Sequence, residues 1–178
     1  MKLTETTLSS RQIYKGRVVH LFEDIVKLEN GKQSFREVVK HPGGVCVLAI
    51  TDDNKVVMVR QFRYAQKATL LEIPAGKLEP DEDPKLCGIR ELEEETGYKA
   101  DSFEFFGKVV PTPAYVGEVI HIYIARGLKK AVQNLDDNEF LEVLEIPFEE
   151  AVRMALDGEI PDAKTQVALF KAKIELNM

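Results

Sequence analysis

The chain has 178 residues, of which 44% are hydrophobic and 30% are charged, and its net charge is −6. This length and composition are those of a globular chain that can bury a sizeable core. No basic stripe is present, and no apolar run approaches the ~20 residues that cross a bilayer. We therefore expect neither nucleic-acid binding nor a membrane span. The N-terminus lacks the apolar core of a signal peptide, so a cytoplasmic location is expected.

The first forty residues have the pattern of a small β-subdomain. Residues 1–10 are polar and are expected to fray. The Asn30-Gly31 pair is a strong hairpin signal. Around it, strands are expected over residues 18–28 and 32–40. The sequence His-Pro-Gly-Gly at 41–44 then interrupts the pattern. We therefore divide the chain into an N-terminal β-hairpin subdomain, 1–42, and a second domain, 43–178.

The second domain combines several short strands with few helices. Its first segment, GVCVLAIT, is almost continuously apolar and predicts a strand that is buried on both faces. Strands are expected at 44–51, 55–62, 70–74, 103–110, 118–126 and 140–146, and amphipathic helices at 147–157 and 162–176. This order favours the α/β class, with helices and a sheet in separate layers.

The cysteines and histidines do not suggest a disulfide or a zinc site. Cys46 and Cys87 lie far apart in the sequence, both in apolar or helical contexts, which favours buried structural thiols. The three histidines show no spacing typical of metal ligands: His20, His41 and His121. We interpret them as structural or surface residues.

Three carboxylates mark the most informative stretch of the chain. Glu91, Glu94 and Glu95 are spaced i, i+3 and i+4, which places them on one face of a helix. Like charges at this spacing weaken a helix by roughly a few tenths of a kcal/mol per pair. A bound divalent cation would offset that repulsion, because hard cations prefer oxygen ligands. The alternative is a solvated acidic surface, which is common on helices.

The residues around these carboxylates predict a helix with defined ends. Asp83 can cap the helix, and Pro84 suits its first position. Gly97 stands where a left-handed C-cap would fall. Apolar side chains recur every three residues and are expected to face the core: Leu86, Ile89 and Leu92.

The whole stretch from Gly76 to Tyr98 reads G-x5-E-x7-R-E-L-x-E-E-x-G-Y. It resembles the Nudix box, the signature of the Nudix hydrolase family, and every fixed position of that signature is present. The resemblance implies a Nudix-type α/β/α sandwich around a mixed sheet, preceded here by the small N-terminal β-subdomain. It also implies metal-dependent hydrolysis of a nucleoside diphosphate linked to another group.

The resemblance assigns roles within the box. Glu91 and Glu95 would bind metal, with Glu94 as a further ligand or a group that holds the attacking water. The backbone carbonyl of Ala75 would complete the metal shell. Arg90 would pair with a box glutamate and fix its orientation. The implied cofactor is Mg²⁺, with Mn²⁺ as its substitute.

The chemistry itself is consistent with these roles. Cleavage of a pyrophosphate needs a water in line with phosphorus and neutralisation of charge on the phosphate oxygens. Metal ions in a carboxylate cluster supply both. The sequence contains no Ser, Cys or His constellation typical of a covalent nucleophile, which is consistent with attack by water.

Features outside the box resemble the ADP-ribose pyrophosphatase branch of the family. Arg63, in RQFR before LEIPAG, matches an arginine that contacts substrate phosphates in that branch. Pro113 lies sixteen residues after Gly97, as a proline does there. Glu118 follows in the same loop and would act as general base or hold the water. Ala114 departs from the glycine usual in the branch, and a box glutamate stays an alternative base.

The resemblance also implies an assembly. In this branch the N-terminal hairpins help to build a homodimer in which one subunit reaches the adenine site of the other. Arg36 stands where such a contact would arise. Adenine could stack on Phe22 or Phe35, although a phenylalanine in a strand is more often part of a core.

We therefore expect a homodimeric, Mg²⁺-dependent enzyme that hydrolyses ADP-ribose or a related ADP-sugar to AMP and a sugar phosphate. The first alternative is a Nudix hydrolase for another nucleotide sugar, such as GDP-mannose. The second is a non-catalytic module that binds nucleotide sugars, which is disfavoured because the box glutamates are all present. The third is an α/β domain whose acidic helix is only surface.

Overall fold

The computed structural model describes residues 3–136 and 138–176. By its internal contacts the chain forms two compact units. The smaller unit comprises Met1–Gly43 and Val110–Val119, and the larger comprises Gly44–Val109 and Ile120–Met178. No helix within the described residues is long and apolar enough to cross a membrane.

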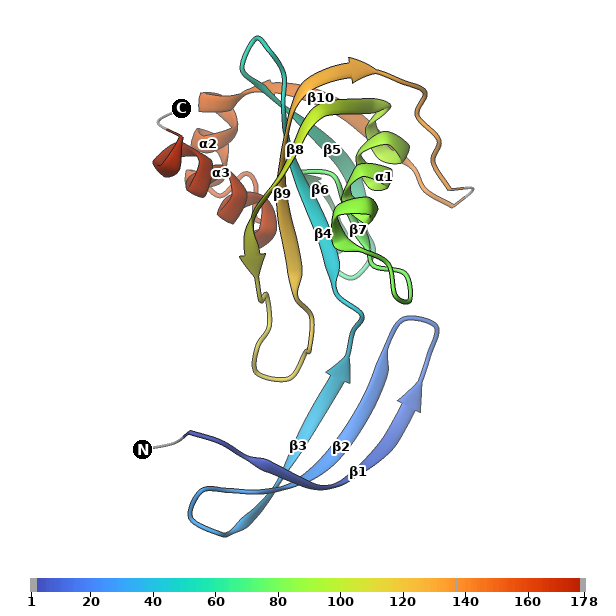
Figure 1. Ribbon diagram of the computed structural model, residues 1–178, viewed down its shortest axis with the longest axis vertical. Coiled ribbons are helices and arrows are strands. Elements are labelled where there is room, and N and C mark those ends of the chain that lie inside the picture. Colours follow the sequence, from blue (N-terminus) through green and yellow to red (C-terminus); the bar gives the residue numbers. More distant parts are fainter. Residues whose placement is uncertain (1–2, 137, 177–178) are drawn as a thin grey trace. The chain divides into compact units, whose positions relative to one another are not determined.

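The smaller unit is a three-stranded antiparallel sheet in the order β1-β2-β3 (Figure 1). Its strands are β1 (Thr6–Lys15), β2 (His20–Lys27) and β3 (Gln33–Lys40). The expected hairpin between β2 and β3 is confirmed, with Gly31 at a φ of 82° in its turn. The expectation that residues 1–10 fray is wrong from Thr6 onward, because pairing with β2 orders this polar segment as a solvent-exposed edge strand.

The segment 110–119 pairs with the free edge of β3. The backbone N–H of Val39 donates to the carbonyl of Tyr115 at 2.7 Å, and the N–H of Gly117 donates to the carbonyl of Val39 at 2.9 Å. Val39 and Val116 form a parallel bridge. The extended loop that the Pro-Thr-Pro sequence predicted is therefore anchored by backbone hydrogen bonds to β3.

The larger unit is built on a mixed sheet in the order β10-β5-β4-β9-β8, with β6 paired to β5 and β7 paired to β4. The strands are β4 (Gly44–Ile50), β5 (Lys55–Arg63), β6 (Ala68–Glu72), β7 (Ala75–Lys77), β8 (Tyr98–Val109), β9 (Ile120–Lys130) and β10 (Leu141–Pro147). β4 and β9 are parallel, and the other pairs are antiparallel. The short strand β7 was not expected, and β8 begins five residues earlier than the sequence suggested.

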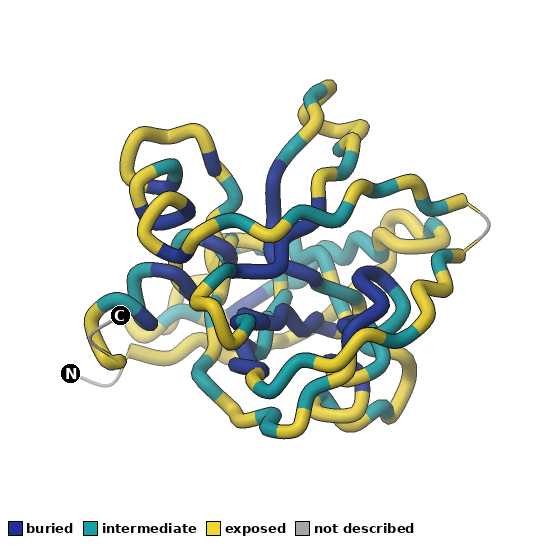
Figure 2. The backbone as a smooth tube through the Cα atoms, turned by 90° about the horizontal axis from the view of Figure 1, so that it is seen from above, coloured by how far each residue is buried: buried dark blue, intermediate teal, exposed yellow. Residues whose placement is uncertain are grey.

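Helices cover both faces of this sheet, as Figure 1 shows. One face packs against α1 (Pro84–Thr96), and the other packs against α2 (Phe148–Leu156) and α3 (Ala163–Glu175). Every residue of β4 is buried, and its side chains alternate between the two cores. The buried segments gather in the interior in Figure 2. This arrangement confirms the α/β/α sandwich around a mixed sheet and explains the continuous apolar run at 44–51.

Helix α1 has the predicted ends but not the predicted apolar face. The side chain of Asp83 accepts from two backbone N–H groups at the start of the helix, and Gly97 is left-handed at its end, with a φ of 67°. Leu92 is buried, but Leu86 and Ile89 are 63% and 39% exposed. A step of three residues turns a helix by only about 300°, so side chains at this spacing drift off one face. The expectation that Leu86 and Ile89 face the core is therefore wrong.

Both cysteines are free and buried, as the sequence indicated. Burial raises the pKa of the Cys46 thiol to about 12, and burial is also the main reason that the pKa of Cys87 rises to about 12. Neither thiol is therefore a reactive nucleophile at neutral pH.

Candidate active site

The site begins where β7 meets helix α1. Gly76 leaves room for the side chain of Glu91, because a Cβ added at Gly76 would lie 1.9 Å from the carboxyl carbon of Glu91. No residue with a side chain can stand at position 76 unless Glu91 moves. The first fixed glycine of the box is therefore a packing partner of its first glutamate.

Arg90 lies among the carboxylates of the box. Its Nε donates to Oε1 of Glu82 at 3.0 Å, and its Nη1 donates to Oε2 of Glu94 at 2.8 Å. The same Nη1 is 2.9 Å from Oε1 of Glu91. Arg90 thus offsets part of the repulsion along the helix, and its hydrogen bond is the main reason that the pKa of Glu82 falls to about 2. The pairing of Arg90 with box glutamates is observed as the sequence predicted.

Glu95 is the buried member of the cluster, with 4% of its surface exposed. Its Oε2 accepts a hydrogen bond from the backbone N–H of Ala75 at 2.9 Å. Burial raises the pKa of Glu95 to about 8, and the charges of Glu91 and Glu139 add to this effect. Burial also raises the pKa of Glu91. Burial thus opposes ionisation of both carboxylates, although Arg90 pairs with Glu91.

This donor set fits a hard divalent cation. Carboxylate oxygens are the ligands that Mg²⁺ prefers, and a bound cation would lower the raised pKa values of Glu91 and Glu95. In the present rotamers Glu91 and Glu94 are turned toward Arg90. Across residues 3–136 and 138–176, no three His, Cys, Asp or Glu side chains already stand in the geometry of a metal cluster. Binding would therefore require these two side chains to turn from Arg90.

A further carboxylate, on the segment between β9 and β10, acts electrostatically on this cluster. The charge of Glu139 raises the pKa of both Glu91 and Glu95. The preceding residues contact the end of α1: Nε2 of Gln133 donates to the carbonyl of Glu95 at 2.6 Å. Sequence reasoning missed Glu139, because it lies more than forty residues beyond the box in a polar segment without a motif.

Arg63 is held by a buried carboxylate. Its Nε and Nη2 donate to the two oxygens of Glu72 at 2.7 and 2.8 Å. Glu72 is only 2% exposed, and Lys164 of α3 donates to it as well. The charge of Arg63 in turn lowers the pKa of Glu95, although burial outweighs it. The structure thus brings Arg63 within electrostatic reach of Glu95.

The two loop residues predicted from the branch lie in the smaller unit. Pro113 is exposed in the turn of the segment 110–119. Glu118 is half-buried, and its Oε1 is 3.5 Å from Nδ1 of His41. The same nitrogen accepts a hydrogen bond from the N–H of Gly43 at 3.1 Å. Among the described residues, His41 is the only ion-pair partner of Glu118.

Arg36 and the two phenylalanines also belong to the smaller unit. Arg36 pairs with Glu5 and donates to the hydroxyl of Ser34 at 3.2 Å. The ring of Phe35 is exposed, whereas the ring of Phe22 is covered by Lys40 at 3.8 Å. A cavity of about 320 Å³ is lined by Leu21, Phe35, Arg36, Glu37, Val39, Ala114 and Tyr115. Of the two rings, Phe35 is therefore the one that a base can reach.

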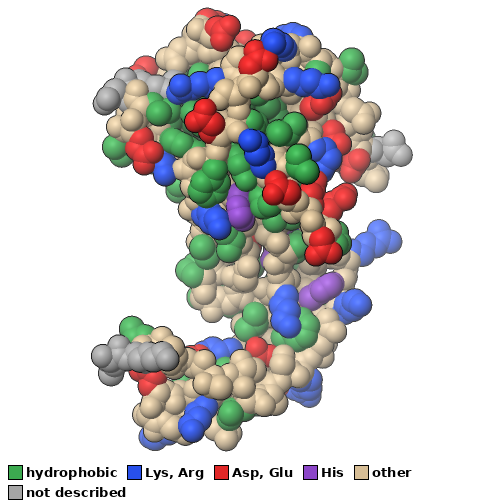
Figure 3. Space-filling view, viewed as in Figure 1, with side chains coloured by type: hydrophobic (Ala, Val, Ile, Leu, Met, Phe, Trp, Pro, Cys, Tyr) green, Lys and Arg blue, Asp and Glu red, His purple; other side chains and the backbone are tan. Residues whose placement is uncertain are grey.

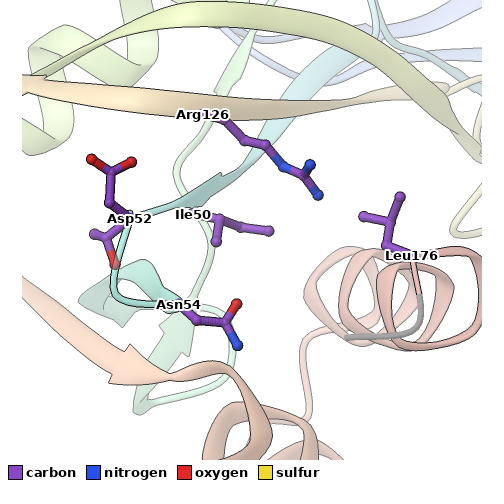
Figure 4. Close-up of a pocket in the computed structure, with 6 residues that line it drawn as sticks. Ile50, Asp52, Asn54, Arg126 and Leu176 are labelled. Carbon is purple, nitrogen blue, oxygen red and sulfur yellow. The ribbon is translucent and has the colours of Figure 1, made fainter.

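The larger unit has a second cavity, of about 380 Å³ (Figure 4). It is lined by Ile50, Thr51, Asp52, Asn54, Arg126 and Leu176. A single carboxylate lines it, so it lacks the ligand set that the box provides. Acidic and basic side chains are interspersed over the face of this unit drawn in Figure 3. This face therefore carries no broad basic surface.

Comparison with family models agrees with this geometry. The model of the NUDIX domain matches residues 40–169. The model of the nucleoside diphosphate sugar hydrolase N-terminal domain matches residues 5–39. Together the two models span most of the chain.

Curated relatives resemble the chain over most of its length. A protein of Bacillus subtilis (strain 168) named ADP-ribose pyrophosphatase is 44% identical over 169 residues, which are 94% of this chain and 91% of that protein. A protein of Bacillus methanolicus named methanol dehydrogenase activator is 45% identical over 93% of this chain and 90% of its own length. A GDP-mannose pyrophosphatase of Yersinia enterocolitica is 36% identical over 80% of this chain and 79% of its own length.

Among solved structures, one described as an ADP compounds hydrolase matches with a TM-score of 0.87. It covers 99% of this chain and 97% of that chain at 21% identity, which shows the fold alone. The resemblance found in the box is confirmed by the match over residues 40–169. The chain therefore belongs to the Nudix hydrolase family.

Proposed function

We propose that the protein is an ADP-sugar pyrophosphatase that hydrolyses ADP-ribose to AMP and ribose 5-phosphate with Mg²⁺, or Mn²⁺ in its place. The observation that carries the proposal is the carboxylate cluster of α1 beside Gly76, in which Glu95 is buried with the backbone N–H of Ala75 as its hydrogen-bond partner. The ADP-ribose pyrophosphatase of Bacillus subtilis, 44% identical, supports the choice of substrate.

In this proposal Glu91, Glu95 and the carbonyl of Ala75 hold the divalent cation, with Glu94 as a further ligand. A bound divalent cation neutralises charge on the phosphate oxygens and makes a water more acidic. Arg90 would pair with a box glutamate and fix its orientation. Its bonds to Glu82 can remain when Glu91 and Glu94 turn toward the cation.

The residues of the chain then direct a simple displacement. Arg63 binds a phosphate of the substrate and holds the phosphorus in line with the water. The oxygen of water forms a bond to that phosphorus as the bond to the bridging oxygen breaks. A carboxylate takes the proton of the water, and the bridging oxygen leaves with the other phosphate.

Three carboxylates are candidates for the general base that takes the proton of the water. The sequence favoured Glu118 or a box glutamate such as Glu94, and the electrostatics of the larger unit add Glu139. The variants Glu118→Gln, Glu94→Gln and Glu139→Gln separate them. The base is the residue whose loss lowers kcat by about 10²-fold or more and removes the acidic limb of the pH–rate profile. A variant that raises KM alone identifies a binding residue instead.

We propose further that residues 1–42 form a dimerisation subdomain and residues 43–178 the hydrolase domain. In the homodimer Arg36, Pro113 and the ring of Phe35 would contact the nucleotide. The exposed ring of Phe35 supports this assignment. The free thiols of Cys46 and Cys87 suit a reducing compartment such as the cytoplasm.

The first test is a panel of nucleotide sugars and dinucleotides, assayed for phosphate release with a coupled phosphatase. Preference for ADP-ribose, lost on chelation, is the expected result. Glu95→Gln should lower turnover far more than tenfold, which corresponds to about 1.4 kcal/mol of barrier. Turnover within tenfold of the wild type would refute the metal-site assignment.

The second candidate is hydrolysis of another nucleotide sugar, such as GDP-mannose. It is favoured by the GDP-mannose pyrophosphatase of Yersinia enterocolitica, which is 36% identical over 80% of the chain. The same panel decides between them, because the box acts on the pyrophosphate and not on the base. Metal-dependent cleavage of GDP-mannose in preference to ADP-ribose would replace the first candidate.

A further inference from the structure

Behind Arg63 lies a chain of buried ion pairs that ends on helix α3. Glu72 accepts hydrogen bonds from Arg63 on one side and from Lys164 on the other. Lys164 is also 3.0 Å from Oδ1 of Asp162. The side chains of Glu72 and Lys164 are 3% and 10% exposed, so this chain is shielded from solvent.

The far end of this network is fixed to the helix and to the short connection between β6 and β7, which leads into the box. Oδ2 of Asp162 accepts from both the N–H and the hydroxyl of Thr165, at 3.0 and 2.6 Å, and so caps α3. The hydroxyl oxygen of Thr165 in turn accepts from the N–H of Ile73 at 2.9 Å. These hydrogen bonds hold the first turn of α3, and therefore the backbone of Lys164, in a defined position.

At the other end of the network, one edge of the Arg63 guanidinium is left without a partner among the described residues. The Nε and Nη2 atoms of Arg63 are both used by Glu72. Within the described residues its Nη1 has no hydrogen-bond partner, and the side chain is 41% exposed. A guanidinium fixed along one edge offers its other edge in a constant direction, which is what recognition of a phosphate oxygen requires.

Lys164 has a physical task in this arrangement. A buried carboxylate with a single cation is poorly compensated, and it can rotate or take up a proton. With cations on both sides, the orientation of Glu72 is determined, and so is the plane of Arg63. Burial raises the pKa of Glu72, but the hydrogen bonds of Arg63 and the charge of Lys164 outweigh it and bring the pKa to about 2.

We propose that Lys164 is a positioning residue, which holds Glu72 so that Arg63 presents its Nη1 edge to a substrate phosphate. Asp162 serves the same purpose one step further away, by holding the ammonium group of Lys164. This inference rests on the proposed function, because it assumes that Arg63 binds the phosphates.

The test compares steady-state kinetics of the wild type with Lys164→Met, Glu72→Gln and the double variant. Lys164→Met should raise KM for the nucleotide sugar on the order of tenfold, as outer partners of site residues do. Since Arg63 would be misplaced but the metal ligands would not, kcat should change by less than about threefold. A purely structural loss would lower the active fraction, and thus kcat, without raising KM.

The double variant tests whether Lys164 acts on substrate binding through Glu72. If Lys164 acts through Glu72, then Lys164→Met should add less than about twofold to the KM of Glu72→Gln. If the two effects multiply, Lys164 acts by another path and the proposal is wrong. The double variant removes a buried charge together with its cation, so it is expected to fold.

Lys173→Met is the matched control. Lys173 lies on the same helix and pairs with Glu149 at the surface, so its loss should leave both constants unchanged. If Lys164→Met does not fold, Lys164→Gln, which keeps a hydrogen-bond donor, is judged by the same criteria.

The outcomes separate this inference from the function on which it rests. Turnover by the wild type with unchanged KM in the Lys164 variant overturns the positioning role alone. Absence of metal-dependent turnover of any nucleotide sugar by the wild type overturns the proposed function and the positioning role together.

Discussion

At the scale of single residues, the site depends on one close approach and one buried charge. Gly76 admits Glu91 to a place that a methyl group would fill. Glu95 is held in the interior beside two other carboxylates, with a backbone N–H as its hydrogen-bond partner. The buried charge of Glu95 costs stability in the metal-free protein, and a bound cation would offset that cost.

Gly76→Ala should displace Glu91 and lower kcat/KM by about 10²-fold, since a displacement of 1 Å has effects of that size. The free energy of unfolding should fall by about 1–3 kcal/mol through overpacking. Gly117→Ala is the control for stability, because its added Cβ would meet nothing closer than 3.7 Å. If Gly76→Ala has the kinetics of the wild type, Glu91 can move aside without loss of activity and the prediction is wrong.

Mg²⁺ should stabilise the protein more at pH 8 than at pH 6. The pKa of Glu95 in the folded protein is about 8, above its ordinary value of 4.5. The metal-free protein therefore loses stability as the pH rises from 4.5 through 8. Binding requires the ionised form, so apparent affinity should fall by up to about tenfold per unit below pH 8. Thermal melts with and without Mg²⁺ measure this. Equal shifts at both pH values, or an undiminished shift in Glu95→Gln, would contradict it.

The contribution of Glu72 to stability depends on pH in the opposite direction from that of Glu95. Its folded pKa of about 2 lies below 4.5, so its contribution is complete above pH 4.5 and is lost as pH falls toward 2. The difference corresponds to roughly 3 kcal/mol. Urea unfolding between pH 3 and pH 6 should therefore show a shallower pH dependence in Glu72→Gln than in the wild type. Parallel curves would mean that Glu72 has the same pKa in the folded and unfolded chains.

At the scale of elements, α1 packs on the sheet and carries the carboxylates on adjoining faces. Its buried residues pack so closely on the sheet that a Cβ at Gly88 would lie 2.8 Å from the ring of Phe103. Its carboxylates are carried next to this face rather than opposite it, since Glu95 itself is buried. The position of the helix against β4 therefore decides both the packing and the depth of the carboxylates.

Leu92→Ala should cost about 2–5 kcal/mol of unfolding free energy, because Leu92 is 1% exposed in the core between α1 and the sheet. Leu86→Ala, on the same helix, should cost less than about 0.5 kcal/mol, because Leu86 is 63% exposed. Chemical denaturation of the two variants measures the difference. Equal losses would mean that Leu86 is covered in solution, for instance by a second copy of the chain.

At the scale of the whole molecule, the two units differ in how much they bury. The larger unit has two apolar cores, one on each face of its sheet. In the three-stranded sheet of the smaller unit, Val26 is the one buried hydrophobic residue among those described. Large apolar side chains are exposed there instead: Leu8, Ile13, Tyr14 and Phe35. A sheet of this kind needs a partner surface to be stable.

The chain should therefore behave as a homodimer, with twice the mass of one chain in light scattering after size exclusion. Ile13→Glu places a charge among the exposed apolar side chains of β1 and should shift the population toward monomer. If the site draws on both subunits, activity should fall in parallel. A monomeric wild type, or a fully active monomeric variant, would refute the proposed assembly.

Much of this molecule could be predicted from local pattern. The hairpin at Asn30-Gly31, the buried strand at 44–51 and both ends of α1 depend on residues near one another, so periodicity and capping rules were sufficient. The edge strand β1 and the exposure of Leu86 could not be predicted in this way. The order of β1 and the exposure of Leu86 depend on tertiary neighbours, which are distant in the sequence.

The sequence by itself determined the family and the carboxylate helix, because the spacing of Gly76, Glu91 and Glu95 is a local property of the chain. Only the tertiary structure decided that Glu95 is buried, that Glu139 acts on the same cluster and that Lys164 stands behind Arg63. These relations join residues from 44 to more than 90 positions apart. Burial and long-range charge depend on how layers pack, and no spacing rule contains that information.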